Sequence, residues 1–150
     1  MEVVIVTGSC GRIGTNVIQK LGQKFQIIGF ELEKTACVIS NEIVIRVDLS
    51  SDESVNEAFF QIGKKFGRRI ASVVHLAAYY SFSEEESPNY EKITVQGTEK
   101  FLELLKDFEV EQFIFSSTML VHKPSWTYPE SIVAAEKILK IGRASCRERV

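Results

Sequence analysis

The first fourteen residues constrain the fold of this chain more than any other stretch. Residues 2–6 are a short run of mostly β-branched apolar side chains, which predicts a buried strand. A turn with glycines at positions 8, 11 and 14 follows, and then a helical pattern. In such a unit Gly8 permits a tight turn, Gly11 lets the backbone approach a pyrophosphate, and Gly14 lets the helix pack close to the strand. The helix N-terminus attracts the anion. A glycine triplet also occurs in purely structural turns, but its place after an N-terminal strand favours a dinucleotide site.

Composition narrows the class of protein. A chain of 150 residues, 45% hydrophobic and 25% charged, is typical of one soluble domain. A net charge of −2 gives no argument for nucleic acid or an anionic membrane as partner. The apolar runs are only strand-length, and the N-terminus lacks the pattern of a signal peptide. Three cysteines, at positions 10, 37 and 146, predict neither a disulfide framework nor a metal site, so we expect a cytoplasmic protein.

The last ten residues, 141–150, break the apolar period of the segment before them. They can be spelled in codons as ATC GGA AGA GCG TCG TGT AGG GAA AGA GTG, which resembles a widely used sequencing adapter along its whole length. We therefore expect residues 1–140 to be the natural domain, cut near Lys140, and residues 141–150 to be adapter read-through. The alternative is a natural basic tail, which the genomic locus would reveal.

Hydrophobic periodicity predicts alternating strands and helices. The predicted strands are 2–6, 25–30, 42–47, 70–76 and 113–115, and the predicted helices are 12–21, 52–62, 88–107 and 131–140. Ser50 or Asp52 would cap the second helix. Strands separated by helices imply right-handed crossovers and therefore an α/β fold, a Rossmann-type, doubly wound parallel sheet of about five strands. Residues 32–41 are the least regular segment.

Polar residues stand at the predicted strand ends, beyond which ligands bind in such sheets. Glu31 lies 17 residues after Gly14, close to where an acid accepts hydrogen bonds from an adenosine ribose. Its charge would repel a 2′-phosphate, so NAD is favoured over NADP; the alternative is a solvated acid at a strand end. Asp48 and Leu49 would receive the adenine, unless Asp48 caps the next helix.

Five motifs in order resemble the extended short-chain dehydrogenase/reductases, the NAD-dependent epimerase/dehydratase family. They are the glycine turn, Glu31, Asp48-Leu49, His75-Leu76-Ala77-Ala78 and Phe115-Ser116-Ser117-Thr118. Members act mainly on nucleotide sugars and related hydroxyl or carbonyl substrates. The resemblance implies NAD as cofactor, contacted also by Cys10, Arg12, Ile13, Leu76, Ala77, Ala78, Tyr80, Thr94 and Ser116. Thr94 stands where the family has asparagine. For His75, packing within a strand is favoured over catalysis.

By the same resemblance, Thr118 is the catalytic hydroxyl and Tyr128 the general acid/base of a Tyr-x-x-x-Lys segment. A phenol has a pKa of about 10, and the lysine four residues on stabilises its phenolate. Here that position is Ile132, which cannot do so. The connection from Thr118 to Tyr128 is also shorter than the family's. These departures point to sequence errors or a decayed copy; alternatively, Tyr128 is only a helix-start aromatic.

The leading hypothesis is the NAD-binding portion of an epimerase/dehydratase-like oxidoreductase, truncated before its substrate-binding half and impaired. Its parent would transfer hydride on a nucleotide sugar or a similar small-molecule substrate. The full-length parent could form a homodimer. The rivals are a non-catalytic NAD(H)-binding regulatory module and a reductase or hydroxysteroid-type dehydrogenase of the same superfamily. Fold alone cannot choose the substrate.

Overall fold

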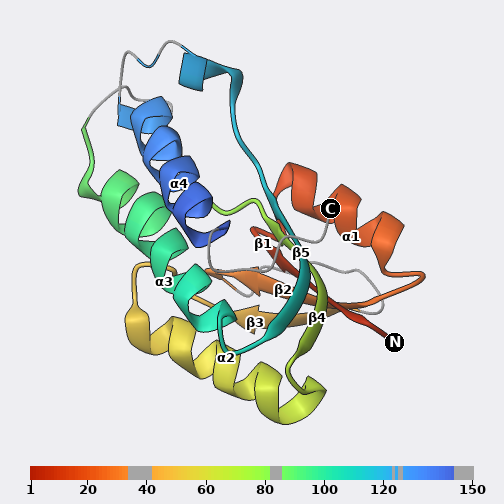
Figure 1. Ribbon diagram of the computed structural model, residues 1–150. Coiled ribbons are helices and arrows are strands. Elements are labelled where there is room, and N and C mark those ends of the chain that lie inside the picture. The colour runs from red at the N-terminus through yellow and green to blue at the C-terminus, as the bar shows by residue number, and fades with distance from the viewer. Residues whose placement is uncertain (34–41, 82–85, 123, 125–126, 144–150) are drawn as a thin grey trace.

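In a computed structural model of the chain, the described residues form one sheet of five parallel strands in the order β3-β2-β1-β4-β5 (Figure 1). The structure describes residues 1–33, 42–81, 86–122, 124 and 127–143. The strands are β1 Val3–Thr7, β2 Gln26–Glu31, β3 Glu42–Arg46, β4 Arg69–His75 and β5 Glu109–Phe115. The predicted α/β class, the parallel sheet and all five strands are confirmed. β5 begins four residues earlier than predicted, because its first half alternates exposed residues with a single half-buried valine.

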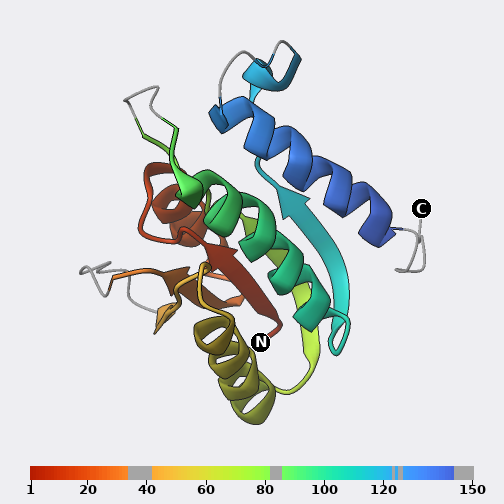
Figure 2. The same ribbon diagram turned by 90° about the vertical axis from the view of Figure 1, so that its left-hand side faces the viewer.

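Helices cover both faces of the sheet, as a doubly wound fold requires (Figure 2). They are α1 Arg12–Leu21, α2 Asp52–Phe66, α3 Gly97–Leu105 and α4 Thr127–Arg143, with a π-helical segment η1 at Tyr90–Gln96 and a 3-10 turn η2 at Met119–His122. α1 packs Ile18 on one face, against Val4 and Val6 of β1. α2 and α3 pack on the other, where Phe59 and Phe101 meet Phe30 edge to face.

Three local expectations differ from the structure. The N-cap of α2 is Ser51, whose side chain accepts from Ser54 N (3.3 Å), and not Ser50 or Asp52. The helix predicted at 88–107 is a wide π-helical segment followed by an α-helix, which a 3.6-residue period does not distinguish. α4 begins at Thr127 rather than near residue 131, because a proline in the first helical turn removes no intrahelical hydrogen bond.

The boundary expected near residue 140 falls inside a helix. α4 continues to Arg143, three residues into the segment 141–150, and residues 144–150 lie outside the described part of the chain. Residues 34–41, most of the irregular segment after β2, also lie outside it. Among the residues that the structure describes, no helix is both long and apolar enough to cross a bilayer.

Candidate cofactor site

The sheet register brings the predicted site residues to one edge. Thr7 is level with Phe30 of β2 and with His75 of β4, and His75 is level with Phe115 of β5. The segments that follow these residues therefore leave the sheet side by side. They carry the glycine turn, Glu31, the Leu76-Ala77-Ala78 loop and Ser116, so four of the five motifs converge where ligands bind in open α/β sheets.

The glycine turn is packed too tightly for side chains. Gly8 has φ +66°, a left-handed conformation, and a Cβ on it would lie 3.2 Å from Ala77 N. A Cβ on Gly14 would overlap the Gly8 carbonyl oxygen and lie 2.6 Å from that of Ser9. Gly14 thus lets α1 approach the carbonyls of the turn itself. These two positions require glycine for steric reasons alone.

The N-terminus of α1 is left without a capping side chain or an acid. Its N-cap is Gly11, and its first turn, which includes Arg12 and Ile13, contains no carboxylate. The N-terminus of α2 has both features, because Ser51 caps it and Asp52 and Glu53 lie in its first turn. The first N–H groups of a helix have no intrahelical acceptor and carry partial positive charge. At α1 these groups remain for an external anion.

Glu31 lies against the glycine turn. Its Oε2 accepts from Cys10 N (2.9 Å) and its Oε1 from Leu32 N (3.2 Å). This half-buried carboxylate is therefore a bonded part of the turn, and not only a solvated acid at a strand end. The Cys10 side chain is disulfide-bonded, contrary to the expectation from the cysteine count; Cys37 and Cys146 lie outside the described residues.

Asp48 is engaged in the loop before α2. Its Oδ1 accepts from the backbone N (2.9 Å) and the hydroxyl (2.6 Å) of Ser50, and its own N donates to Ser54 Oγ (2.9 Å). These bonds form a turn ahead of the helix, and Ser51 is the N-cap of α2, so the alternative that Asp48 caps this helix is wrong. Leu49 lies close to α3, because a Cβ on Gly97 would come within 2.8 Å of the Leu49 carbonyl oxygen. The adenine contact expected of Asp48 and Leu49 stays a prediction.

His75 is the centre of a buried hydrogen-bond network. Thr98 Oγ1 donates to the Thr94 carbonyl oxygen (2.6 Å), so it accepts from His75 Nε2 (3.1 Å). The other ring nitrogen, Nδ1, then accepts from Thr7 Oγ1 (3.0 Å). Burial lowers the pKa of His75 from 6.5 to about 4, so the ring is neutral near pH 7. This satisfied, neutral ring supports the structural interpretation of His75.

The same network fixes the loop after β4. Thr7 Oγ1 accepts from Leu76 N and Ala77 N, each at 3.1 Å. Thr94 Oγ1 accepts from Tyr79 N (3.0 Å), so the threonine at the family's asparagine position holds the backbone beside Ala78 and Tyr80. The role of Thr7 was missed from the sequence, because a threonine at a strand end gives no signal of a partner far along the chain.

Tyr128 returns to the β4 end of the site despite its short connection. Its ring packs edge to face on Tyr80 (centroids 5.0 Å apart) and lies 6.4 Å from Tyr90. Burial, and secondarily Tyr80 and Tyr90, raises the pKa of Tyr128 above 10. Ile132, one turn later, is only 1% exposed. The surroundings therefore oppose the phenolate that a general base requires.

The segment after β5 carries the remaining predicted groups. Ser116 N donates to the His75 carbonyl oxygen (3.1 Å), which extends the pairing of β5 with β4. Thr118 Oγ1 accepts from Leu120 N (3.4 Å) at the start of η2. Ser117 Oγ donates to Glu136 of α4 (2.5 Å), a link that the sequence did not predict because the partners lie 19 positions apart.

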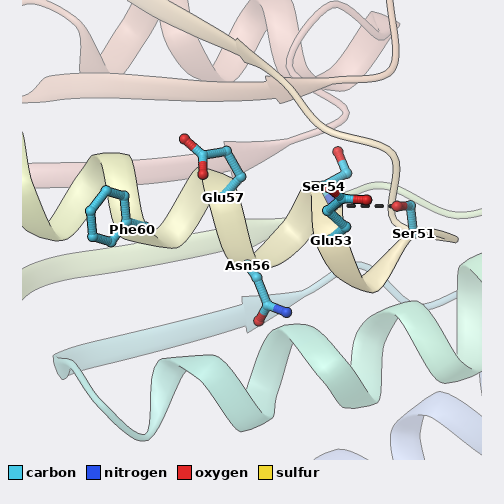
Figure 3. A pocket seen from close by; sticks show the side chains of 6 residues that line it. All are labelled: Ser51, Glu53, Ser54, Asn56, Glu57 and Phe60. Atoms are coloured by element: carbon cyan, nitrogen blue, oxygen red, sulfur yellow. Dashed lines mark hydrogen bonds between the residues drawn. The ribbon is translucent and has the colours of Figure 1, made fainter.

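A shallow depression also lies along α2, away from these groups (Figure 3). Its lining residues are Ser51, Glu53, Ser54, Asn56, Glu57 and Phe60. All six come from the N-cap and exposed side of one helix, and none belongs to the glycine turn or the β4 and β5 loops. It therefore lacks the converging polar groups of a built site.

With this geometry established, the fold and the strand-end site define a nucleotide-binding α/β protein. Residues 4–140 match the sequence model of the NAD-dependent epimerase/dehydratase family, and the chain belongs to that family. The match covers every motif from the glycine turn to Tyr128, so the resemblance predicted from those motifs is confirmed.

Solved structures share the fold at low sequence identity. The WbmH enzyme of Bordetella bronchiseptica, solved with NAD+, superposes with a TM-score of 0.79 at 20% identity over 95% of this chain and 52% of that one. UDP-glucose 4-epimerase of Thermotoga maritima, solved with UDP-glucose, gives 0.79 at 21% identity, covering 95% and 51%. A short-chain dehydrogenase/reductase superfamily protein of Agrobacterium tumefaciens, with bound NAD, gives 0.78 at 21% identity, covering 96% and 46%. The chain spans about half the length of these proteins.

Proposed function

We propose that this chain is the NAD-binding portion of an epimerase/dehydratase-type oxidoreductase. The observation that carries the proposal is the N-terminus of α1, which lacks a cap and an acid while the turn before it is closed by Gly8 and Glu31. A diphosphate supplies the negative charge and the acceptors that this N-terminus lacks. Family membership and two neighbours crystallised with NAD support the same cofactor.

The other site residues would contact different parts of the cofactor. Arg12 and Ile13 would contact the diphosphate, Glu31 the adenosine ribose, and Ser116 the nicotinamide side. Glu31 would also favour NAD, because its carboxylate opposes a 2′-phosphate. NAD, when bound, supplies the hydride acceptor. Thr118 would hydrogen-bond the substrate oxygen and Tyr128 would move the proton, at a rate limited by the absence of a cation at Ile132. The substrate class we propose is a nucleotide sugar, as in the neighbour solved with UDP-glucose.

The test is calorimetric titration of NAD and NADP into the chain and the variant Ile13→Glu. Ile13 is 60% exposed, so the substitution disturbs no packing. A first-turn acid stabilises a helix by about 0.3–1 kcal/mol, yet here it would repel the diphosphate. We expect NAD affinity to fall about 10-fold or more, with unfolding stability preserved.

Gln19→Glu is the matched control, since it adds the same charge in the last turn of α1. It should leave NAD affinity within about 2-fold, because charge effects at a helix end fall off within one turn. Wild-type binding that is equal for NAD and NADP would contradict the role of Glu31. Absence of binding to either would contradict the cofactor site itself.

A second candidate is a non-catalytic NAD(H)-binding module. The buried Ile132 and the raised pKa of Tyr128 favour it. A chain extended by a relative's second half separates the two, assayed on nucleotide sugars with and without Ile132→Lys. Turnover that rises with the lysine supports the enzyme; NAD binding without turnover in both supports the module.

A further inference from the structure

Residues at the end of β2 accept hydrogen bonds from three successive N–H groups of the glycine turn. Gly8 N (2.9 Å) and Ser9 N (3.4 Å) donate to the Phe30 carbonyl oxygen, and Cys10 N donates to Glu31 Oε2 (2.9 Å). Gly11 N donates back to the Gly8 carbonyl oxygen (3.1 Å). The backbone donors of the turn are thus held by the protein as far as Gly11, and the free donors begin inside α1.

Glu31 differs from the other acceptors in this set. The Phe30 and Gly8 acceptors are backbone carbonyls, which every residue type provides. The bond to Cys10 depends on a side chain with the charge and the reach of glutamate. Leu32 N donates to the other carboxylate oxygen and holds its orientation from the strand side.

We propose that Glu31 is a positioning residue for the diphosphate cradle, in addition to its expected contact with the adenosine ribose. This inference rests on the proposed NAD site. By fixing Cys10, Glu31 sets the turn that aims the first N–H groups of α1 at the diphosphate. A carboxylate accepts about four hydrogen bonds, so the bonds to Cys10 and Leu32 leave acceptor sites for ribose hydroxyls. One carboxylate then couples the ribose half of the site to the phosphate half.

Electrostatics alone predicts the opposite effect on a diphosphate. A carboxylate beside a diphosphate site repels the anion, so Glu31 as a ribose ligand only would weaken the binding of a ligand that lacks ribose. Inorganic pyrophosphate is such a ligand, and ADP carries both parts. Comparing the two probes separates positioning from ribose recognition.

Two substitutions separate the reach of Glu31 from its charge. Glu31→Asp keeps the charge but is one methylene too short for Cys10 N. Glu31→Gln keeps the reach and loses the charge, and its single amide oxygen can accept from Cys10 N but not also from Leu32 N. We expect Glu31→Asp to weaken pyrophosphate and ADP binding in calorimetry, each about 5-fold or more. Glu31→Gln should keep pyrophosphate affinity at or above the wild-type value and weaken ADP only. Glu99→Gln, on the exposed side of α3, controls for net charge.

Amide hydrogen exchange gives an independent readout. It is measured by NMR without ligand and with the Cys10 disulfide kept in one redox state. In Glu31→Asp the Cys10 amide should exchange about 10-fold faster or more. The Gly8 amide, bonded to a backbone carbonyl, is the internal reference. In Glu31→Gln the Cys10 amide should remain protected.

Unchanged pyrophosphate affinity in Glu31→Asp, or unchanged exchange at Cys10, would overturn the positioning role and leave the ribose role standing. A wild-type chain that binds neither ADP nor pyrophosphate would instead contradict the proposed cofactor site. The exchange rates would then still decide whether Glu31 holds the turn, so the two failures are distinguishable.

Discussion

Thr7 and His75 fix the loop after β4 through buried hydrogen bonds. Thr7 Oγ1 serves three partners at once: two amides of the loop after β4 and Nδ1 of His75. Its oxygen has no lone pair left, so it cannot accept a proton from a charged imidazole. Protonation of His75 would place an N–H group on Nδ1 opposite the Thr7 hydroxyl, which is itself the donor in this contact. The Thr7–His75 hydrogen bond would then break, and the Leu76-Ala77 loop that Thr7 holds would be released.

This arrangement predicts acid instability from one residue. The folded pKa of His75, about 4, is below its ordinary value of 6.5, so the unfolded chain takes up the proton first. The stabilisation is complete above pH 6.5 and is lost as the pH falls towards 4. We expect the free energy of unfolding in urea to fall by about 3 kcal/mol over this range on account of His75.

His75→Asn provides the comparison. This variant should be less stable than wild type at neutral pH, because it loses the two bonds of the ring, and its stability should fall less between pH 6.5 and 4. Parallel pH profiles for the two proteins would show that carboxylates, and not His75, cause the acid instability.

At the scale of elements, close approach decides where glycine is needed. α3 packs against the loop before α2 through Gly97, where a Cβ would lie 2.8 Å from the Leu49 carbonyl oxygen and 3.1 Å from Leu49 Cβ. Gly63 lies inside α2, where a Cβ would meet only the Phe108 ring, at an ordinary 3.6 Å from Cζ and 4.0 Å from Cε1. The same substitution should thus have opposite effects in two neighbouring helices.

Gly63→Ala should stabilise the chain by about 0.5–1 kcal/mol, because alanine has the better helix propensity. Gly97→Ala should destabilise it by about 1–3 kcal/mol, since backbone must move to relieve the contact with Leu49. Thermal unfolding of both variants beside wild type measures the difference. A stabilised Gly97→Ala variant would show that α3 does not approach Leu49 this closely.

The elements also show what sequence can predict. Each strand was located from a short apolar run, but the polar first half of β5 was not predicted, because it lacks such a run. The π-helical segment was not, because Tyr90 and Val95 are buried within a wide turn that a regular period does not describe. The glycine turn and Glu31 were located from spacing alone. The Cys10–Glu31 bond and the His75 network were not, because they join residues far apart in the chain.

At the scale of the whole molecule, β3 and β5 are the outer strands of the sheet in the part of the chain that the structure describes. β5 carries Ile114, which is 43% exposed and, by its register with Val74, lies on the α1 side of the sheet. An edge strand with an exposed apolar side chain favours association between chains.

Ile114→Lys should therefore lower concentration-dependent light scattering, with a change in stability within about 1 kcal/mol. Gln112→Lys adds a similar charge to the same strand and the same face, and it leaves Ile114 in place. We expect little effect from this control. Equal reductions in the two variants would assign the association to net charge rather than to Ile114.

The central position of β1 has a consequence for the order in which the sheet forms. Val3 pairs with Gln26, but Val4 pairs on its other side with Ser72, which is made much later. During synthesis, the edge of β1 that pairs with β4 therefore stays unpaired until β4 has emerged from the ribosome. Pairing between segments so distant in the chain is slow, because a long loop must close first. β1, which is made before β4, is therefore completed late, and nascent chains that stop before β4 leave the β4-facing edge of β1 unpaired.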